Sequence, residues 1–302
     1  MRRETVETFK AYVDLTRAQF FFVWPLLFCS GLFLAFEHYD GFTWSLTIRA
    51  ALIGLFGFEA GLILNDYVDR EADRKDIERD KLTKYWRLFR RRPVAEGLIS
   101  PGKALGLFLL LAALALALIA TLPPKNALHL TAIMAYSYAA EYFYQVKKRD
   151  QTVPVAQILG RTDFALFPVA GYLCLGSPDA TALLYFLFFY PFALAHLGVN
   201  DIADMRNDEA RGMKTVPVLY GLRGAALWVL AFTAIHLCAA VLFAAVLPAA
   251  TLAGFAAGFV LLGIADCRIA RAPKPETGLA VLPLFHLAML LYTTGIILGD
   301  AF

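Results

Sequence analysis

Long apolar runs alternate with short polar segments along almost the whole chain. Nine of these runs have about the 20 residues that an α-helix needs to cross the hydrocarbon core of a bilayer. This alternation is typical of a polytopic membrane protein. The predicted spans are residues 18–37, 45–66, 103–121, 126–146, 153–175, 180–201, 222–247, 250–267 and 278–298.

The composition agrees with this interpretation. Of the 302 residues, 59% are hydrophobic and only 18% are charged, and the mean hydropathy is +0.60. Soluble domains carry about 25% charged residues. Because a helical bundle in lipid forms one unit, the sequence predicts a single all-α membrane domain over residues 1–302. The four cysteines are isolated and show neither a disulfide framework nor the spacing of a zinc site.

The connections between spans differ in charge from one side to the other. Short connections such as EHYDGFTWS, LPPKN and GSPDA carry almost no positive charge, whereas the alternate ones are basic. Of the 28 Lys and Arg residues, only Arg49 and Lys125 lie on the first side. By the positive-inside rule, we expect the N-terminus and the basic loops in the cytoplasm and the C-terminus outside.

Two copies of one acidic pattern follow apolar runs on the predicted cytoplasmic side. NDYVDREAD occupies residues 65–73 and NDIADMRND residues 200–208, and both read N-D-x-x-D-x-x-x-D. The copies end the second and the sixth predicted spans. Because four spans separate the copies, the chain is compatible with an internal repeat of residues 18–146 and 153–267.

Helical continuation through each motif would gather oxygen atoms on one face. Asn65, Asp69 and Asp73 recur every four residues, and the second copy has the same spacing. Carboxylates this close repel one another unless a cation lies between them. Oxygen ligands without Cys or His suit Mg²⁺, which completes its shell with waters and substrate phosphates. The expected metal ligands are Asn65, Asp69, Asp73, Asn200, Asp204 and Asp208.

Basic residues in the neighbouring loops suit a polyanion. Arginine binds phosphate oxygens through paired N–H groups, and lysine binds them as a point charge. Arg17 lies at the start of the first span, where a charge is costly unless it is paired or faces a cavity. The loop residues that could reach phosphate are Arg92, Lys147, Lys148, Arg149, Arg161, Arg206, Arg211 and Lys214.

Other interpretations of the acidic motifs compete with a metal–diphosphate site. A helix end rich in Asp and Arg at a membrane surface is compatible with solvated ion pairing alone. A transporter would use the motifs as a cation site, and a membrane scaffold would need no ligands at all. Transporter sites tend to lie near the bilayer midplane, whereas these motifs lie at its edge among Lys and Arg.

Four stretches together resemble the UbiA superfamily of intramembrane prenyltransferases. NDYVDREAD matches the first Asp-rich motif of that family, and RPVAEGLIS, from Arg92, is similar to the stretch that follows it. YQVKKRDQTVPVAQILG, from Tyr144, resembles the family's Tyr-x-x-x-Lys-Arg segment. NDIADMRNDEARGMKTVPVLYG matches the second Asp-rich motif. The resemblance covers nearly the whole chain.

The resemblance implies nine helices around a central cavity, with a cytoplasmic cap from loops 66–103 and 201–222. It implies Mg²⁺-dependent transfer of a prenyl group from a prenyl diphosphate to a lipophilic acceptor, with two ions expected, release of pyrophosphate and no nucleic-acid partner. A glyceryl ether lipid, a quinone precursor, a porphyrin and a second isoprenoid are all compatible acceptors. The expected catalytic residues are Asp66, Asp201, Tyr144 and Lys148. The expected diphosphate ligands are Arg17, Arg92, Lys147, Lys148, Arg149 and Lys214.

Two segments depart from the family pattern. The link between the first motif and Arg92, RKDIERDKLTKYWRLFRR, is longer and more basic than usual, and Arg17 is followed by Ala18 in place of proline. His196 lies four residues before Asn200, one turn away on the same face, and could touch substrate. A satisfied buried imidazole is the alternative for His196.

Overall fold

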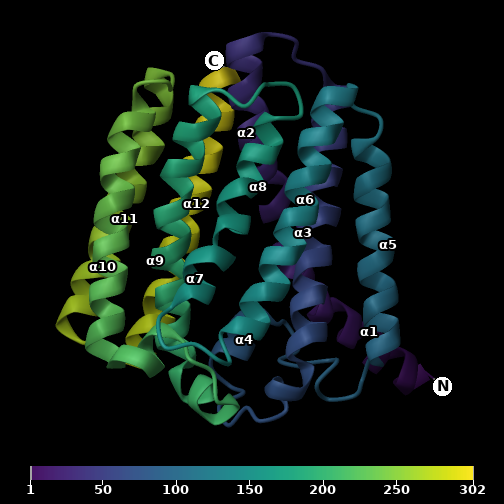
Figure 1. Ribbon diagram of the computed structural model, residues 1–302, viewed down its shortest axis with the longest axis vertical. Helices are drawn as coiled ribbons and strands as arrows, with labels where there is room; N and C mark the ends of the chain where they lie inside the picture. The colour runs from purple at the N-terminus through teal and green to yellow at the C-terminus, as the bar shows by residue number, and fades with distance from the viewer. Residues whose placement is uncertain (1, 302) are drawn as a thin grey trace.

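The computed structural model describes the backbone of residues 2–301 and the side chains of residues 5–299 (Figure 1). This part of the chain is almost entirely helical and contains no β-strand, which confirms the predicted all-α class. Two 3₁₀ turns lie at Ala18–Phe20 and Ala249–Thr251. The helices are α1 (Arg2–Leu15), α2 (Val23–Tyr39), α3 (Trp44–Asp73), α4 (Leu82–Trp86), α5 (Pro101–Ile119), α6 (Pro124–Lys147), α7 (Val155–Gly160), α8 (Thr162–Tyr172), α9 (Ala180–Arg211), α10 (Val216–Ala244), α11 (Leu252–Arg271) and α12 (Pro275–Ala301).

The long helices form a closed ring with further helices on its outside. α2, α3, α6, α8, α9 and α12 each contact the next helix in this order, and α12 returns to α2. α5 packs on α3, α10 packs on α9, and α11 packs on α12. The two ends of the chain lie at opposite ends of the bundle (Figure 1).

Within the part of the chain that the structure describes, seven helices are long and apolar enough to cross a membrane. The predicted spans 126–146 and 153–175 correspond to α6 and to the pair α7–α8, which are not among these seven. α6 carries polar side chains such as Glu141 on the wall of the ring interior, and the other span breaks near Arg161 into two short helices. Length and hydropathy therefore do not confirm the predicted number of nine spans, although the chain is helical within all nine predicted ranges.

Both acidic motifs lie inside helices, at their C-terminal ends. α3 continues through Asp73, and α9 continues through Arg211. The N-cap of α9 is Asp179, whose side chain accepts a hydrogen bond from the Ala182 amide at 2.9 Å. The helix ends at Gly212, whose φ of 75° is a left-handed conformation that terminates helices and favours glycine. The predicted four-residue stripes are therefore present on both helices.

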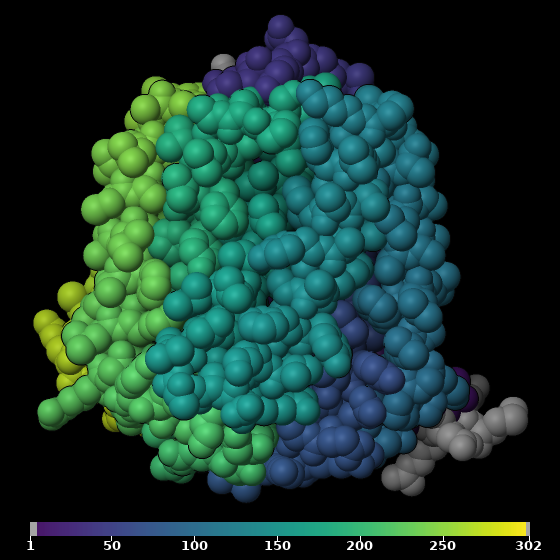
Figure 2. All heavy atoms as spheres, viewed as in Figure 1, coloured from purple at the N-terminus to yellow at the C-terminus, as the bar shows by residue number. Residues whose placement is uncertain are grey.

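The ring interior is filled in the half away from the motifs. α2 and α8 approach closely there, because a Cβ atom at Gly31 would collide with the carbonyl oxygen of Pro168. Tyr185, Phe188 and Phe189 of α9 are fully buried in the core. The space-filling view shows side chains of α6 to α9 closing one face, with the segment after α3 over its lower end (Figure 2).

Candidate active site

A cavity of about 480 Å³ lies inside the ring, in the half that holds the acidic motifs. Residues four apart on a helix share one face, which explains why a whole stripe from each motif points inwards. The stripes come from the C-terminal ends of α3 and of α9. The motif residues that line the cavity are Asn65, Asp69, Asp73, Asn200, Asp201, Asp204 and Asp208.

Arg211, the last residue of α9, joins the two motifs. Its guanidinium nitrogens lie 3.0 Å from Asp204 and 3.4 Å from Asp208 on its own helix, and 3.6 Å from Asp73 of α3. All four side chains are nearly buried, with between 5% and 8% of each exposed. Since one cation contacts carboxylates of both helices, the two acidic helix ends face each other at the mouth of the cavity.

Arg92 closes the same cluster from the loop after α3. Its guanidinium lies 2.6 Å from Asp73 and 2.6 Å from Asp76, and Arg211 lies 2.5 Å from Asp76. Burial raises the pKa of the Asp76 carboxyl above its usual range, and the two arginines oppose this rise. Asp76 lies three residues beyond the first motif, so the repeated pattern did not reveal it.

Basic groups from α6 and α7 surround Tyr144 and Asp69. Lys148 Nζ lies 2.7 Å from Asp69, and Arg149 lies 2.8 Å from the other oxygen of that carboxylate. Lys148 Nζ lies 4.7 Å and the Arg161 guanidinium carbon 5.1 Å from the centre of the Tyr144 ring. Tyr144 is 5% exposed and lines the cavity. Its ring thus lies beside two cations, one of which, Lys148, also pairs with Asp69 on the acidic stripe of α3.

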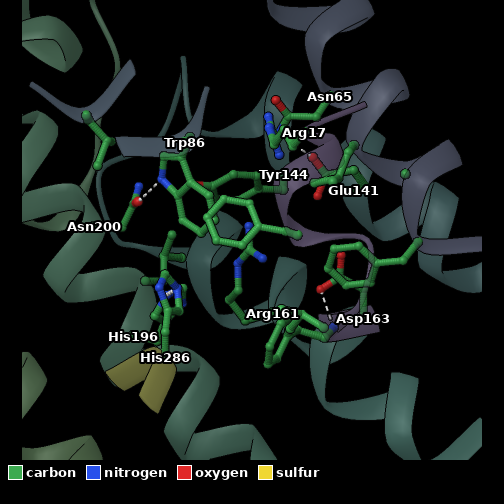
Figure 3. Close-up of a pocket in the computed structure, with 18 of the residues that line it drawn as sticks. Arg17, Asn65, Trp86, Glu141, Tyr144, Arg161, Asp163, His196, Asn200 and His286 are labelled. Carbon is green, nitrogen blue, oxygen red and sulfur yellow. Dashed lines mark hydrogen bonds between the residues drawn. The ribbon is translucent and has the colours of Figure 1, made fainter. Parts of the chain in front are cut away.

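The first asparagine of each motif is held by a neighbour across the cavity wall. Asn65 donates a hydrogen bond to Glu141 of α6 at 2.8 Å. Trp86 of α4 donates its indole N–H to Asn200 at 3.2 Å (Figure 3). The first contact ties α3 to α6, and the second ties the segment after α3 to α9.

Asp66 differs from the other motif residues because it is not among the side chains that line the cavity. Arg87 Nη2 donates to both of its oxygens, at 2.7 and 2.8 Å, and Arg17 donates at 3.2 Å. Arg87 also donates to the backbone carbonyl of Asp14 at 2.8 Å. Asp66 therefore fastens α1 and the segment after α3 to the bundle, while its expected catalytic role stays a prediction.

The predicted diphosphate ligands divide into two sets. Arg17, Arg92 and Lys148 line the cavity. Lys147, Arg149 and Lys214 are not among its lining residues, although Arg149 reaches the outer side of Asp69. The second set therefore lies at or beyond the rim.

The segment 74–92 contributes more to the cavity than its sequence suggested. Tyr85 and Trp86 from α4 line the wall, and Arg87 holds the segment to Asp66. His286 of α12 also lines the cavity and contacts Tyr85. An aromatic pair inside a basic link was the available signal, but nothing in the sequence showed that the link folds back into the ring.

The cavity becomes apolar with distance from the motifs. Phe58 of α3 and Phe167 of α8 pack edge to face with ring centroids 4.9 Å apart, and Phe58 stacks on Trp24 at 3.8 Å. Leu287 and Leu290 of α12 complete this part of the wall. Such a cavity matches a ligand with a charged head and an apolar tail.

The motif carboxylates of Asp69, Asp73, Asp204 and Asp208 are paired with cations, and the described residues hold no ready metal site. No three His, Cys, Asp or Glu side chains in residues 5–299 are grouped as metal ligands. The donors nevertheless suit Mg²⁺, because the two stripes offer only oxygen ligands. Asp201 is 2% exposed, and its Oδ2 has no hydrogen-bond partner within the described chain. A buried carboxylate oxygen with a free lone pair fits a cation at this place.

Comparisons with known proteins agree with the fold and the motifs. A 4-hydroxybenzoate octaprenyltransferase of Psychrobacter arcticus is 27% identical over 229 residues, which are 70% of this chain and 68% of that protein. A protoheme IX farnesyltransferase of Anaeromyxobacter sp. is 28% identical over 270 residues, which are 87% of this chain and 83% of that protein.

Solved structures show the same helical fold. A UbiA homologue from Aeropyrum pernix matches with a TM-score of 0.73 and 20% identity, over 93% of this chain and 98% of that one. A UbiA homologue from Archaeoglobus fulgidus, solved with DMAPP and Mg²⁺, matches with a TM-score of 0.64 and 18% identity, over 95% and 98%. The UbiA prenyltransferase family model matches residues 22–292. The chain therefore belongs to the UbiA prenyltransferase family and is an integral membrane prenyltransferase.

Proposed function

We propose that the protein transfers an isoprenyl group from a prenyl diphosphate to a lipophilic acceptor and releases pyrophosphate, with Mg²⁺ as cofactor. The contact of Arg211 with carboxylates of both motifs carries this proposal. It supports a polyanion site where the two helix ends meet. The apolar wall beyond that point supports an isoprenoid tail.

The acidic stripes are the proposed metal site. When bound, Mg²⁺ neutralises charge at the phosphate oxygens and makes the pyrophosphate a better leaving group. Mg²⁺ takes few protein ligands, and two ions would be shared between the stripes and the diphosphate. The proposed ligands are Asn65, Asp69, Asp73, Asn200, Asp204 and Asp208, with Asp201 beside them.

The cations that now pair with the carboxylates are the proposed diphosphate ligands. Arg92, Arg211 and Lys148 are nearly buried and already lie beside Asp73, Asp204 and Asp69. Arginine would bind two phosphate oxygens at once, and lysine one. Arg17 would act from the α1 side of the same cavity.

The prenyl group is proposed to react beside Tyr144. As the allylic C–O bond breaks, the departing charge is held by the basic residues and the positive charge stays on the allylic carbon. An aromatic face stabilises such a cation by about 0.5–2 kcal/mol. The aromatic and aliphatic side chains of the cavity wall beyond the stripes would limit the access of water, which would otherwise capture the cation.

The relatives support this substrate class. Structures of the Archaeoglobus fulgidus homologue were solved with DMAPP and with GPP, each with Mg²⁺. The curated relatives include 4-hydroxybenzoate and protoheme IX transferases, so aromatic and porphyrin acceptors are the first to test. The basic loops support a cytoplasmic position for the acidic end and for the N-terminus.

The test is pyrophosphate release by the purified protein in lipid nanodiscs. Geranylgeranyl diphosphate and Mg²⁺ would be supplied with 4-hydroxybenzoate, protoheme IX or a glyceryl ether lipid in turn. We expect release that one acceptor accelerates, that a chelator abolishes, and that Asp69→Asn/Asp204→Asn lacks. Glu209→Gln, an exposed acid on the same helix, is the control and should keep activity. Release unaffected by the chelator and by the double variant would contradict the proposal.

A further inference from the structure

Three polar side chains from different helices form one hydrogen-bonded chain in the cavity wall. The hydroxyl of Tyr85, on α4, lies 2.5 Å from His286 Nδ1, on α12. His286 Nε2 lies 2.9 Å from Nε2 of His196, on α9. All three side chains line the cavity, and the two imidazoles lie against each other in Figure 3.

This hydrogen-bonded chain can carry a proton, because each of its three side chains can both donate and accept a hydrogen bond. Where two Nε2 atoms meet, one donates and the other accepts, so the two imidazoles must hold complementary tautomers. Exchange between the two tautomer sets moves one proton from the His196 end to the Tyr85 end. His196 Nδ1, the ring nitrogen that does not face His286, forms the other end of these hydrogen bonds, and the His196 side chain lines the cavity.

The place of His196 on α9 relates the hydrogen-bonded chain to the expected site of reaction. His196 precedes Asn200 by four residues and so lies about 6 Å deeper along α9, at 1.5 Å per residue. The ring of His196 stacks on Phe192 and Phe164, with centroids 6.4 and 6.3 Å away. A polar end among aromatic rings, one turn below the acidic stripe, suits an acceptor placed beyond the allylic carbon.

Tyr85, at the other end of the hydrogen-bonded chain, belongs to the polar cap. Tyr85 belongs to the segment 74–92, which carries many charges and covers the motif end of the bundle. Burial raises the pKa of Tyr85 to about 12, so the phenol keeps its proton near neutral pH. A neutral hydroxyl can pass a proton on by giving up one as it receives another.

We infer that His196 is the base that takes the proton of the acceptor, with His286 and Tyr85 as positioning residues that pass it to the cap. The inference rests on the proposed prenyl transfer. The allylic C–O bond breaks with its electron pair on the diphosphate, and the acceptor carbon or oxygen bonds to the allylic carbon. That atom gives its proton to His196 Nδ1. His196 Nε2–H passes to His286, His286 Nδ1–H passes to Tyr85, and the phenol proton leaves to water.

A partial reaction tests the base without knowledge of the acceptor. Geranyl diphosphate and Mg²⁺ alone would be incubated with the protein in nanodiscs. The geranyl cation then either captures water, which gives geraniol or linalool, or loses a proton to a nearby base, which gives myrcene or ocimene. Pyrophosphate release measures ionisation of the donor. The ratio of diene to alcohol measures how often the cation loses a proton to a base before it captures water.

We expect His196→Asn to lower the diene-to-alcohol ratio at least about tenfold while pyrophosphate release stays within about threefold. His286→Gln and Tyr85→Phe should lower the same ratio less. Free imidazole should restore it in His196→Ala. His129→Gln, on α6 and not among the lining residues, is the matched control and should match the parent protein.

The outcomes distinguish a catalytic base from side chains that only hold α4 in place. If the histidines only fasten α4, the variants lose pyrophosphate release and keep the ratio, which would overturn the inference. Diene absent from the parent protein despite normal pyrophosphate release would also overturn it. Should His196→Asn fail to fold, His286→Gln and Tyr85→Phe carry the test. A parent protein without any Mg²⁺-dependent release would instead reject the proposed prenyl transfer itself.

Discussion

Asp66 and Asp201 hold the same place in two copies of one motif, but their surroundings are opposite. Asp66 lies outside the cavity wall and accepts hydrogen bonds from Arg87 and Arg17. Asp201 lines the cavity, has no ion pair within the described residues, and leaves one oxygen without a partner. Both are nearly buried, at 4% and 2% exposed.

This difference shows that a repeated sequence pattern does not repeat its contacts. On α3, the second position of the motif holds the inserted segment to the bundle. On α9, the same position presents a free carboxylate oxygen to the cavity. We therefore expect Asp66 to contribute to stability and Asp201 to activity.

The largest expected effect is on stability, at Asp66. Asp66→Leu leaves Arg87 buried without its partner, which costs about 3–5 kcal/mol of unfolding free energy. Reversible unfolding in mixed micelles measures this loss. A change below about 1 kcal/mol would show that Asp66 is not the anchor.

Asp201→Asn should affect activity and leave stability intact. The amide removes the negative charge beside the proposed metal site, and loss of one such electrostatic group lowers turnover about a hundredfold. Unfolding free energy should stay equal or rise, because an unpaired buried charge is itself costly. Steady-state pyrophosphate release beside the unfolding curve measures both. Unchanged turnover in Asp201→Asn would contradict the expected contribution of Asp201 to activity.

Mg²⁺ should stabilise the protein more when the carboxylate of Asp201 is present beside the acidic stripes. A ligand at about ten times its dissociation constant adds about 1.4 kcal/mol to the folded state. We expect this gain for the parent protein and a clearly smaller one for Asp201→Asn. Unfolding curves with Mg²⁺ and with a chelator measure the difference. Equal gains in both proteins would show that Asp201 does not contribute to metal binding.

The smallest expected effect comes from removing both partners of the buried pair. Asp66→Leu/Arg87→Met leaves no unpaired charge at that place, so its stability should return to within about 1 kcal/mol of the parent protein. The same unfolding assay checks this. A double variant as unstable as Asp66→Leu alone would mean that shape, and not charge pairing, holds the segment.

The sequence was sufficient for the parts of the site that follow from helical periodicity. Asn65, Asp69 and Asp73 share a face because residues four apart do so on any helix, and the same holds for Asp204 and Asp208. The all-α class and seven of the nine predicted spans followed from long apolar runs in the same way, whereas the spans 126–146 and 153–175 are not confirmed within the described residues.

Features that depend on how distant segments pack could not be predicted. Nothing in the neighbourhood of Asp66 shows that Arg87, 21 residues later, returns to pair with it. Tyr85 meets His286 across 201 residues of sequence, so only the folded ring reveals their contact. The break near Arg161 likewise arises where the chain bends around the cavity, within a run that reads as one span.

A metal site shared by the two acidic helix ends is tested most directly with Mn²⁺, a paramagnetic substitute for Mg²⁺. Its binding to the protein would be measured with geranyl S-thiolodiphosphate. Electron paramagnetic resonance would count bound ions with and without this unreactive donor. We expect tight binding that needs the donor, survives in Glu209→Gln, and is lost both in Asp69→Asn and in Asp204→Asn. Binding that either single variant retains in full would contradict a site shared by the two acidic helix ends.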